Sequence, residues 1–254
     1  MKEPEVMQLA DRIRRLEAVP LSTVAESSVE VPYALLAKVQ EALLHGETHY
    51  TVRLGLPELR RLLAGEVARR GGLSHESSID DVVVTTGESE ALFVTLLGMS
   101  LPPGEVLVAS FLPRRHEALF RLMELEVRDS DEARRRAGDR VRLVYREASS
   151  RETTQAELLS FASEQDLPDI LNLEHELGGG GNASFPPFAE ERTVILGDLD
   201  AFTGMASFRV GFLMGPERWL RRIRVWKQAL TICSPAPSQR AAWVALGGIE
   251  ESAS

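Results

Sequence analysis

The sequence predicts an α/β fold: a three-layer α/β/α sandwich around a mainly parallel, seven-stranded sheet. Short runs rich in Val, Ile and Leu alternate with longer segments of helical periodicity from residue 79 onward. Runs such as DVVVT at 81–85 and VRLVY at 141–145 are rich in β-branched and other apolar residues, which is typical of strands. A chain of 254 residues is long enough to bury the core that such a sandwich requires.

The N-terminal part reads as an arm followed by helices. Residues 1–30 are mostly polar, and residues 33–45 carry an apolar stripe at helical spacing. A second helix begins at Pro57 and ends at the glycine pair 71–72. We therefore expect an N-terminal arm and helix over 1–44 and one large domain over 45–250.

Strands and helices alternate through the large domain. The candidate strands are residues 81–85, 105–109, 125–128, 141–145, 169–173, 193–197 and 208–214. Helical runs lie at 88–99, 115–124 and 154–164, and two closing helices are expected at 217–230 and 237–249. This alternation predicts strands joined by helical crossovers, and hence a largely parallel sheet.

Composition narrows the classes of partner. The formal charge of -9 argues against binding to nucleic acid or to an anionic membrane. The single cysteine, Cys233, cannot form an internal disulfide, which fits a reducing compartment. The first residues contain no apolar run of the kind found in signal peptides or membrane spans, so we expect a cytoplasmic protein.

The stretch VVVTTGESEALF contains a candidate anion site. An apolar strand runs into Gly87, and a helix opens at Glu88 and Ser89. Backbone N–H groups and the helix dipole favour a bound anion at such a turn. We call Gly87, Glu88 and Ser89 the anion cradle. In the later strand 208–214, Arg209 and Gly211 share one face.

These motifs resemble those of the class I/II aminotransferases, the fold-type I enzymes that use pyridoxal 5′-phosphate (PLP). The spacing of Tyr50, Gly55, Leu59 and Arg60 is similar to a further pattern of that family. The resemblance implies PLP as cofactor, with its phosphate in the anion cradle and on Arg209. It also implies a sheet whose last strand is antiparallel, and a small C-terminal domain that is absent from this sequence.

The resemblance further implies self-association. In the family Tyr50 would reach the phosphate of the neighbouring subunit, so a homodimer, or a heterodimer with a related aminotransferase, is expected. Without a small domain, apolar surface near Trp243 and Leu246 is expected to be uncovered.

The residues of the chemistry depart from the family pattern. Counting back eight residues from Arg209 places Ala201 where the family has the lysine that forms the Schiff base. Asn172, or Leu173 if the register slips, stands where an aspartate pairs with the pyridine nitrogen. Asp198 and Asp200 replace two serines near the phosphate. These changes predict a catalytically inactive pseudoenzyme.

Two alternatives remain open at this point. One is an active PLP-dependent aminotransferase that uses a lysine other than the expected one. The other is a metal-assisted enzyme at Asp198 and Asp200, with the Glu-His-Glu run 174–176 nearby. For the inactive protein, the sequence predicts that Asp198 replaces the phosphate as the partner of Arg209, with Asp200 as second choice.

Overall fold

The computed structural model describes residues 31, 33–72, 78–108, 112, 114–129, 140–150, 152–173, 184–199 and 208–247. The predicted arm at 1–30, the run 174–176, and Asp200 and Ala201 lie outside these residues. Within the described part, no helix combines the length and the apolar character that crossing a membrane requires.

In the described residues the sheet has seven strands, the number that the sequence predicts, and their order is β1-β7-β6-β5-β4-β2-β3. They are β1 (Val82–Thr85), β2 (Gly104–Val108), β3 (Leu125–Asp129), β4 (Val141–Glu147), β5 (Asp169–Asn172), β6 (Thr193–Asp198) and β7 (Gly211–Met214). Strands β3, β2, β4, β5 and β6 are mutually parallel. The last strand, β7, lies between β1 and β6 and is antiparallel to both.

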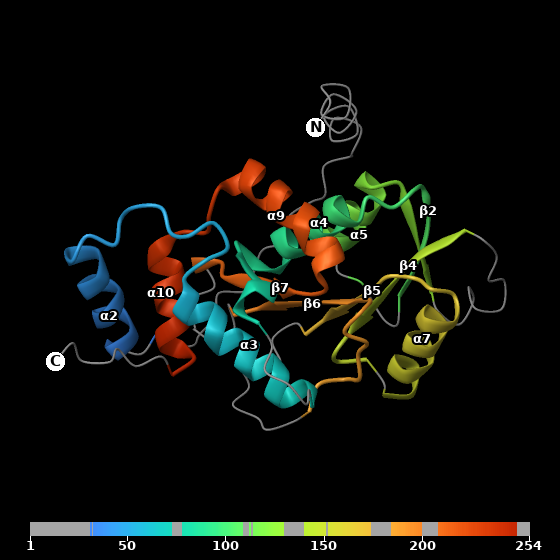
Figure 1. Cartoon of the computed structure of the whole chain (residues 1–254), viewed down its shortest axis with the longest axis horizontal. Coiled ribbons are helices and arrows are strands. Elements are labelled where there is room, and N and C mark those ends of the chain that lie inside the picture. The colour runs from blue at the N-terminus through green and yellow to red at the C-terminus, as the bar shows by residue number, and fades with distance from the viewer. Residues whose placement is uncertain are drawn as a thin grey trace.

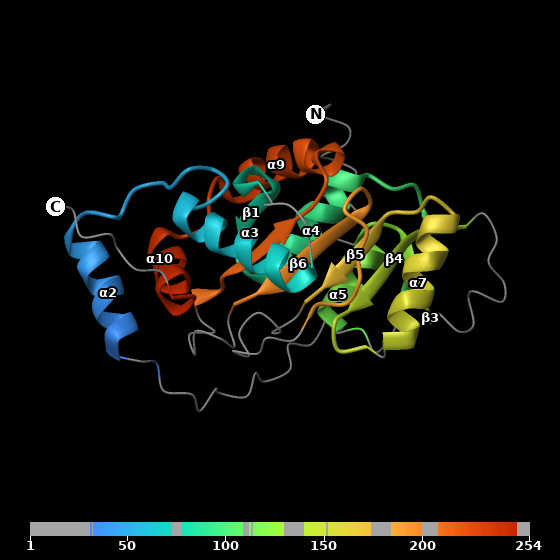
Figure 2. The same ribbon diagram turned by 60° about the horizontal axis from the view of Figure 1, so that its bottom comes forward.

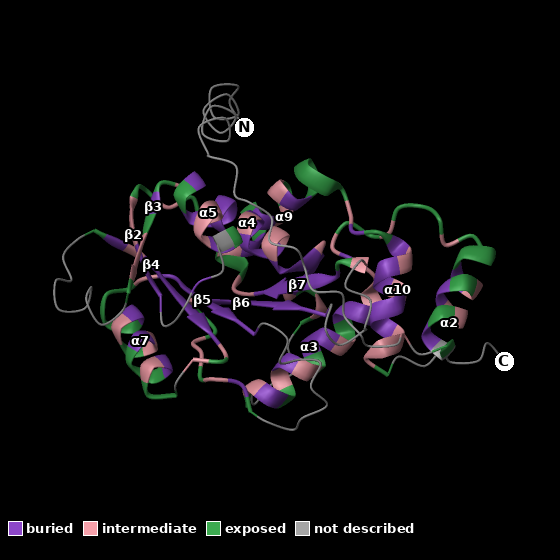
Figure 3. Ribbon diagram, turned by 180° about the vertical axis from the view of Figure 1, so that it is seen from behind, coloured by how far each residue is buried: buried purple, intermediate pink, exposed green. Residues whose placement is uncertain are grey.

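Helices cover both faces of the sheet (Figures 1 and 2). On one face lie α4 (Gly87–Met99), α5 (Arg114–Leu122) and α9 (Glu217–Thr231); on the other lie α3 (Pro57–Gly71) and α7 (Glu152–Glu164). The strands between these layers are mostly buried, except for β3 and the start of β2 at one edge of the sheet (Figure 3). The predicted three-layer sandwich is therefore confirmed.

At the β1 end of the sheet, α2 (Tyr33–Leu44) packs against α10 (Ala236–Ala245). Leu35 and Val39 of α2 bury their side chains with Ala241 of α10. The helix predicted for the N-terminal region thus lies against one of the two closing helices, far from α7 and β3 (Figure 1).

Three predicted details are wrong. The last strand begins at Gly211 instead of residue 208, because Arg209 has a φ of 48°, which no strand residue adopts. The final helix ends at Ala245 instead of 249, just before Gly247, whose φ is 84°. Trp243 is only 6% exposed, packed in the core that α3 and α10 share, so it offers no uncovered apolar surface.

Candidate active site

The carboxyl ends of the strands gather the predicted site residues at one edge of the sheet. Gly211 pairs with Thr85 at the end of β1 and with Asp198 at the end of β6. Asn172 ends β5, two strands away from β7 in the sheet. In sheets of this kind, ligands bind at this edge.

The turn at Gly87 is built by close contact with β7. Gly87 has a φ of 76°, and a β-carbon on it would overlap the guanidinium of Arg209, 2.8 Å from Cζ. A β-carbon on Gly211 would stand 2.8 Å from the backbone nitrogen of Glu88. Glycine at both positions lets the strand and the start of α4 meet. The exposed Arg209 thereby lies beside the positive end of the helix.

Glu88, the second residue of the anion cradle, is 3% exposed and turns its carboxylate toward α5. Arg115 Nη2 donates to Glu88 Oε1 at 2.7 Å. His116 Nε2 lies 2.7 Å from the same oxygen, off the direction of an ideal hydrogen bond. Burial alone would raise the pKa of Glu88, but His116 and Arg115 outweigh burial and lower that pKa to about 2. The carboxylate is therefore ionised at neutral pH.

A buried polar chain continues from Glu88 to the end of β5. His116 Nδ1 lies 3.2 Å from the hydroxyl of Tyr145, and Asn172 Nδ2 donates to that hydroxyl at 3.0 Å. All of these side chains are buried. The chain joins the anion cradle to the residue expected near the pyridine nitrogen.

Strand alternation places Asn172 and Leu173 on opposite faces of the sheet. Asn172 bonds to Tyr145, which belongs to the core beneath α4 and α5. Leu173 packs in the core beneath α3. Of the two residues considered from the sequence, Asn172 is the one on the same face as the anion cradle.

Asp198 also lies on the α4 face, since it follows Leu196 of that core by two residues. Its side chain is buried, whereas Arg209 is exposed. The predicted pairing of Asp198 with Arg209 stays a prediction. Asp200 and Ala201 lie outside the described residues, so the lysine position is known from the sequence alone.

The remaining predicted residues divide between the site and the surface. Ser89 lies half-buried in the first turn of α4. Tyr50 is 80% exposed between α2 and α3, away from its own chain's core. Both lysines that the structure describes are ion-paired with glutamates: Lys38 with Glu41, and Lys227 with Glu90.

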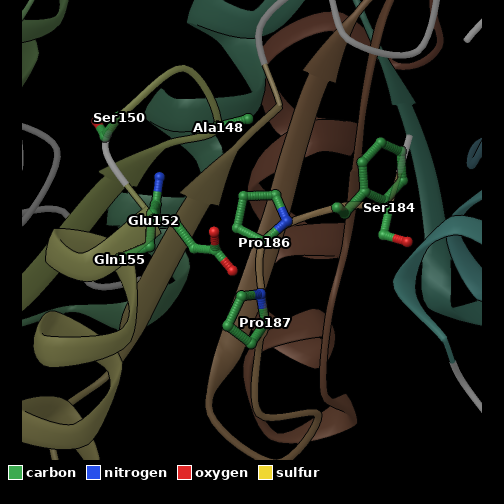
Figure 4. A pocket seen from close by; sticks show the side chains of 8 residues that line it. Ala148, Ser150, Glu152, Gln155, Ser184, Pro186 and Pro187 are labelled. Atoms are coloured by element: carbon green, nitrogen blue, oxygen red, sulfur yellow. The ribbon is translucent and has the colours of Figure 1, made fainter.

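A separate cavity of about 340 Å³ lies between the start of α7 and the segment 184–187 (Figure 4). Its lining residues are Ala148, Ser150, Glu152, Gln155, Ser184, Phe185, Pro186 and Pro187. Figure 4 shows the Glu152 carboxylate directed toward the two prolines. Phe185 and Gln155 belong to the α3 and α7 side, so this cavity and the anion cradle lie on opposite faces of the sheet.

In the described part of the chain, no three His, Cys, Asp or Glu side chains are grouped as a metal site would require. Asp198 is described, but Asp200 and the run 174–176 are not. The metal-assisted alternative therefore stays untested.

Known proteins similar to this chain share one family. Arginine–pyruvate transaminase of Pseudomonas aeruginosa is 27% identical over 92% of this chain. Aspartate/prephenate aminotransferase of Thermus thermophilus is 27% identical over 88%, and aspartate aminotransferase of Rhizobium meliloti is 23% identical over 89%. This chain spans 65%, 62% and 61% of their respective lengths. No protein-family model matches the chain.

The chain is similar in sequence to these aminotransferases. Solved structures agree in fold. A mutant of Thermus thermophilus aspartate aminotransferase matches with a TM-score of 0.79 at 24% identity, covering 92% of this chain and 70% of its own. Rhizobium meliloti aspartate aminotransferase matches with a TM-score of 0.77 at 21% identity, covering 99% of this chain and 69% of its own.

PLP is the cofactor that this aminotransferase resemblance implies, and the residues fit only part of it. Arg209 beside the turn at Gly87 suits a phosphate group. At the other end, Asn172 is a neutral amide engaged by Tyr145, and it cannot hold a proton on the pyridine nitrogen as a carboxylate does. Asn172 therefore does not fit the pyridine ring of PLP, on which the reaction depends. No reaction step through PLP follows from this aminotransferase-like site.

Sequence reasoning missed three residues of the aminotransferase-like site. His116 and Tyr145 are recognisable only once α5 and β4 are placed beside Glu88. The sequence predicts that Lys227 lies well past the site and that no lysine is within reach of Gly87 and Arg209. The structure instead pairs Lys227 with Glu90 in the first turn of α4, and Glu90 accepts a hydrogen bond from the backbone of Thr86. The only sequence signal was the presence of two glutamates in the first turn of a helix that should bind an anion.

Proposed function

We propose that the chain is a non-catalytic aminotransferase-like protein, a binding or assembly module that keeps an anion cradle and lacks PLP chemistry. The observation that carries this proposal is the state of Asn172. Its side chain is 1% exposed and donates to Tyr145, within a chain of buried groups that ends at the ionised Glu88. A buried amide that is already hydrogen-bonded is held in place by the surrounding fold, and it supplies no charge to a pyridine ring.

The lysines support the same proposal. Transamination needs a free lysine amine for the Schiff base and for proton transfer. The sequence has only Lys2, Lys38 and Lys227. Lys38 pairs with Glu41 on α2, and Lys227 is 1% exposed and paired with Glu90. Ala201 at the expected position has no amine.

In this proposal the large domain over 45–250 associates with a second subunit, as a homodimer or with a related aminotransferase. Apolar side chains are exposed at the α2 end: Tyr33, Leu44, Tyr50 and Val52. Exposed apolar side chains grouped at one end of a molecule favour a protein–protein contact. Tyr50 would then lie near the neighbouring subunit, as the resemblance implies.

The test is titration of the purified chain with PLP and, separately, with inorganic phosphate. We expect measurable phosphate binding by calorimetry, no transamination, and no PLP covalently attached to a lysine after borohydride reduction. The attachment is read by intact mass. A covalent adduct at any lysine, together with turnover of an amino acid, would favour the active aminotransferase instead. Failure to bind phosphate would overturn the proposed anion cradle.

A further inference from the structure

The first turn of α4 carries two carboxylates, Glu88 and Glu90, where an anion would bind. Acidic side chains stabilise the start of a helix, but they also repel an anion held by the same turn. Glu90 lies especially close to the turn before α4, because its Oε2 accepts a hydrogen bond from the backbone nitrogen of Thr86 at 2.5 Å. An anion cradle with these two charges left uncompensated would bind phosphate weakly.

Lys227 compensates Glu90 from α9. Its ammonium lies 3.3 Å from Glu90 Oε1, and it also donates to Thr231 Oγ1 at 2.5 Å and to Ser234 Oγ at 3.3 Å. Thr231 in turn donates to Glu90 Oε1 at 2.7 Å. All three ammonium donors therefore have partners. With Lys227 1% exposed and the Glu90 side chain 11% exposed, the two opposite charges are held together away from water.

Glu88 is compensated in the same way from α5, by Arg115 at 2.7 Å. Each carboxylate of the turn is thus matched by a cation from a different helix. Arg209 and the start of the helix bring positive charge to the same turn. The two ion pairs reduce the negative charge that the glutamates would otherwise add there.

We propose that Lys227 is a positioning and charge-balancing residue of the anion cradle: by neutralising Glu90, it sets the affinity of the cradle for a phosphate-bearing ligand. This rests on the proposed function, in which the cradle binds an anion. Lys227 does not touch the anion, and it acts through Glu90 and the Thr86 turn.

The test measures binding of inorganic phosphate to the full chain at pH 8 by titration calorimetry. Lys227→Met leaves the Glu90 charge in place and should lower the affinity about tenfold, whereas Glu90→Gln leaves the Lys227 charge and should raise it by a similar factor. The double variant should bind phosphate like the wild type. Both single variants leave one charge without its partner and so reduce thermal stability. A purely structural role would lower the affinity in both, so opposite signs distinguish the two roles.

A second variant avoids any risk of misfolding. The Arg115 side chain is 58% exposed, so Arg115→Ala should fold normally and lower phosphate affinity severalfold by uncovering the Glu88 charge. Arg121→Ala, on the same helix but paired with Glu117, is the matched control and should change nothing. If wild-type protein binds no phosphate, the proposed function fails. If it binds phosphate, but Lys227→Met and Glu90→Gln change the affinity in the same direction or not at all, the role of Lys227 is wrong.

Discussion

The guanidinium of Arg209 lies directly against the α-carbon of Gly87, in the space that any side chain on Gly87 would occupy. Gly87→Ala should therefore displace Arg209 and abolish measurable phosphate binding. The φ of 76° adds a backbone cost of about 1–2 kcal/mol for a residue with a β-carbon. Calorimetry with inorganic phosphate and chemical denaturation check the two effects.

Gly65→Ala is the matched control for that substitution. Gly65 lies within α3, and a β-carbon on it would have no atom within 4 Å. Alanine there should stabilise the protein by about 0.5–1 kcal/mol and leave phosphate binding unchanged. If Gly87→Ala, like Gly65→Ala, leaves phosphate binding unchanged, the close contact between Gly87 and Arg209 is not needed for binding.

Glu88 predicts a specific dependence of stability on pH. Its pKa is lowered to about 2 in the folded protein, so its ionised form stabilises the fold above the unfolded pKa near 4.3. This contribution is lost as the pH falls through the folded value. Glu88→Gln should cost on the order of 3 kcal/mol at pH 7, and the difference from wild type should shrink steadily between about pH 4.5 and 2.

Guanidinium denaturation at several pH values measures that difference. Glu41→Gln is the control, because Glu41 forms a surface pair with Lys38 whose removal should have a much smaller effect. A Glu88→Gln penalty that stays constant from pH 7 to 2.5 would mean that packing, and not charge, explains the role of Glu88.

Arg146 and Asp169 form another buried ion pair, on the α7 side of the sheet. Two parallel bonds of 2.9 and 2.6 Å join them, and both side chains are fully buried. Asp169→Asn leaves the guanidinium without its counter-charge and should destabilise the fold by about 3–5 kcal/mol, measured by denaturation. Asp169→Leu combined with Arg146→Met should recover much of this loss. No recovery in the double variant would show that the other bonds of Arg146 dominate.

Asp198→Ser tests whether the carboxylate of Asp198 takes the place of a bound phosphate beside Arg209. If Asp198 pairs with Arg209, its carboxylate competes with phosphate, so the wild type should bind phosphate only weakly and serine should increase the affinity by about tenfold or more. Transamination should not return, because Ala201 has no amine. Unchanged phosphate affinity in Asp198→Ser would contradict the predicted pairing.

Much of the fold could be predicted because burial on both faces favours runs of apolar residues, and β1 and β6 contain such runs. The start of β7 could not. Arg209 has a positive φ because the chain must bend there against Gly87, a contact between segments far apart in sequence. Local preference alone favours a strand at that position.

The candidate site was predictable only where backbone geometry dictates the residue. Gly87 and Gly211 are such positions, since each meets the backbone or side chain of the other segment. The partners of Glu88 and Glu90 come from α5 and α9, and no spacing in the sequence signals them. Lys227 is an example. Its helix, α9, follows the site in sequence but packs against α4, the helix whose first turn forms the anion cradle.

The exposed apolar side chains at the α2 end predict a dimer of micromolar or tighter affinity. Leu44 is 77% exposed, and Leu44→Glu should shift sedimentation from dimer to monomer because a charge would be buried in the contact. Glu126→Lys, on β3 at the opposite end of the sheet, is the control and should leave the dimer intact. A wild-type monomer at micromolar concentration would contradict the expected association.

The position of β7 also dictates when this protein can finish folding during synthesis. Strand β1 and the start of α4 are made early, but their neighbour in the sheet, β7, is made after all the other strands that the structure describes. Until β7 arrives, one edge of β1 and one edge of β6 stay open to wrong pairing, and the nascent chain is at its most aggregation-prone. Because Arg209 and Gly211 are made together with that strand, the cradle can bind an anion only after β7 has closed the sheet between β1 and β6.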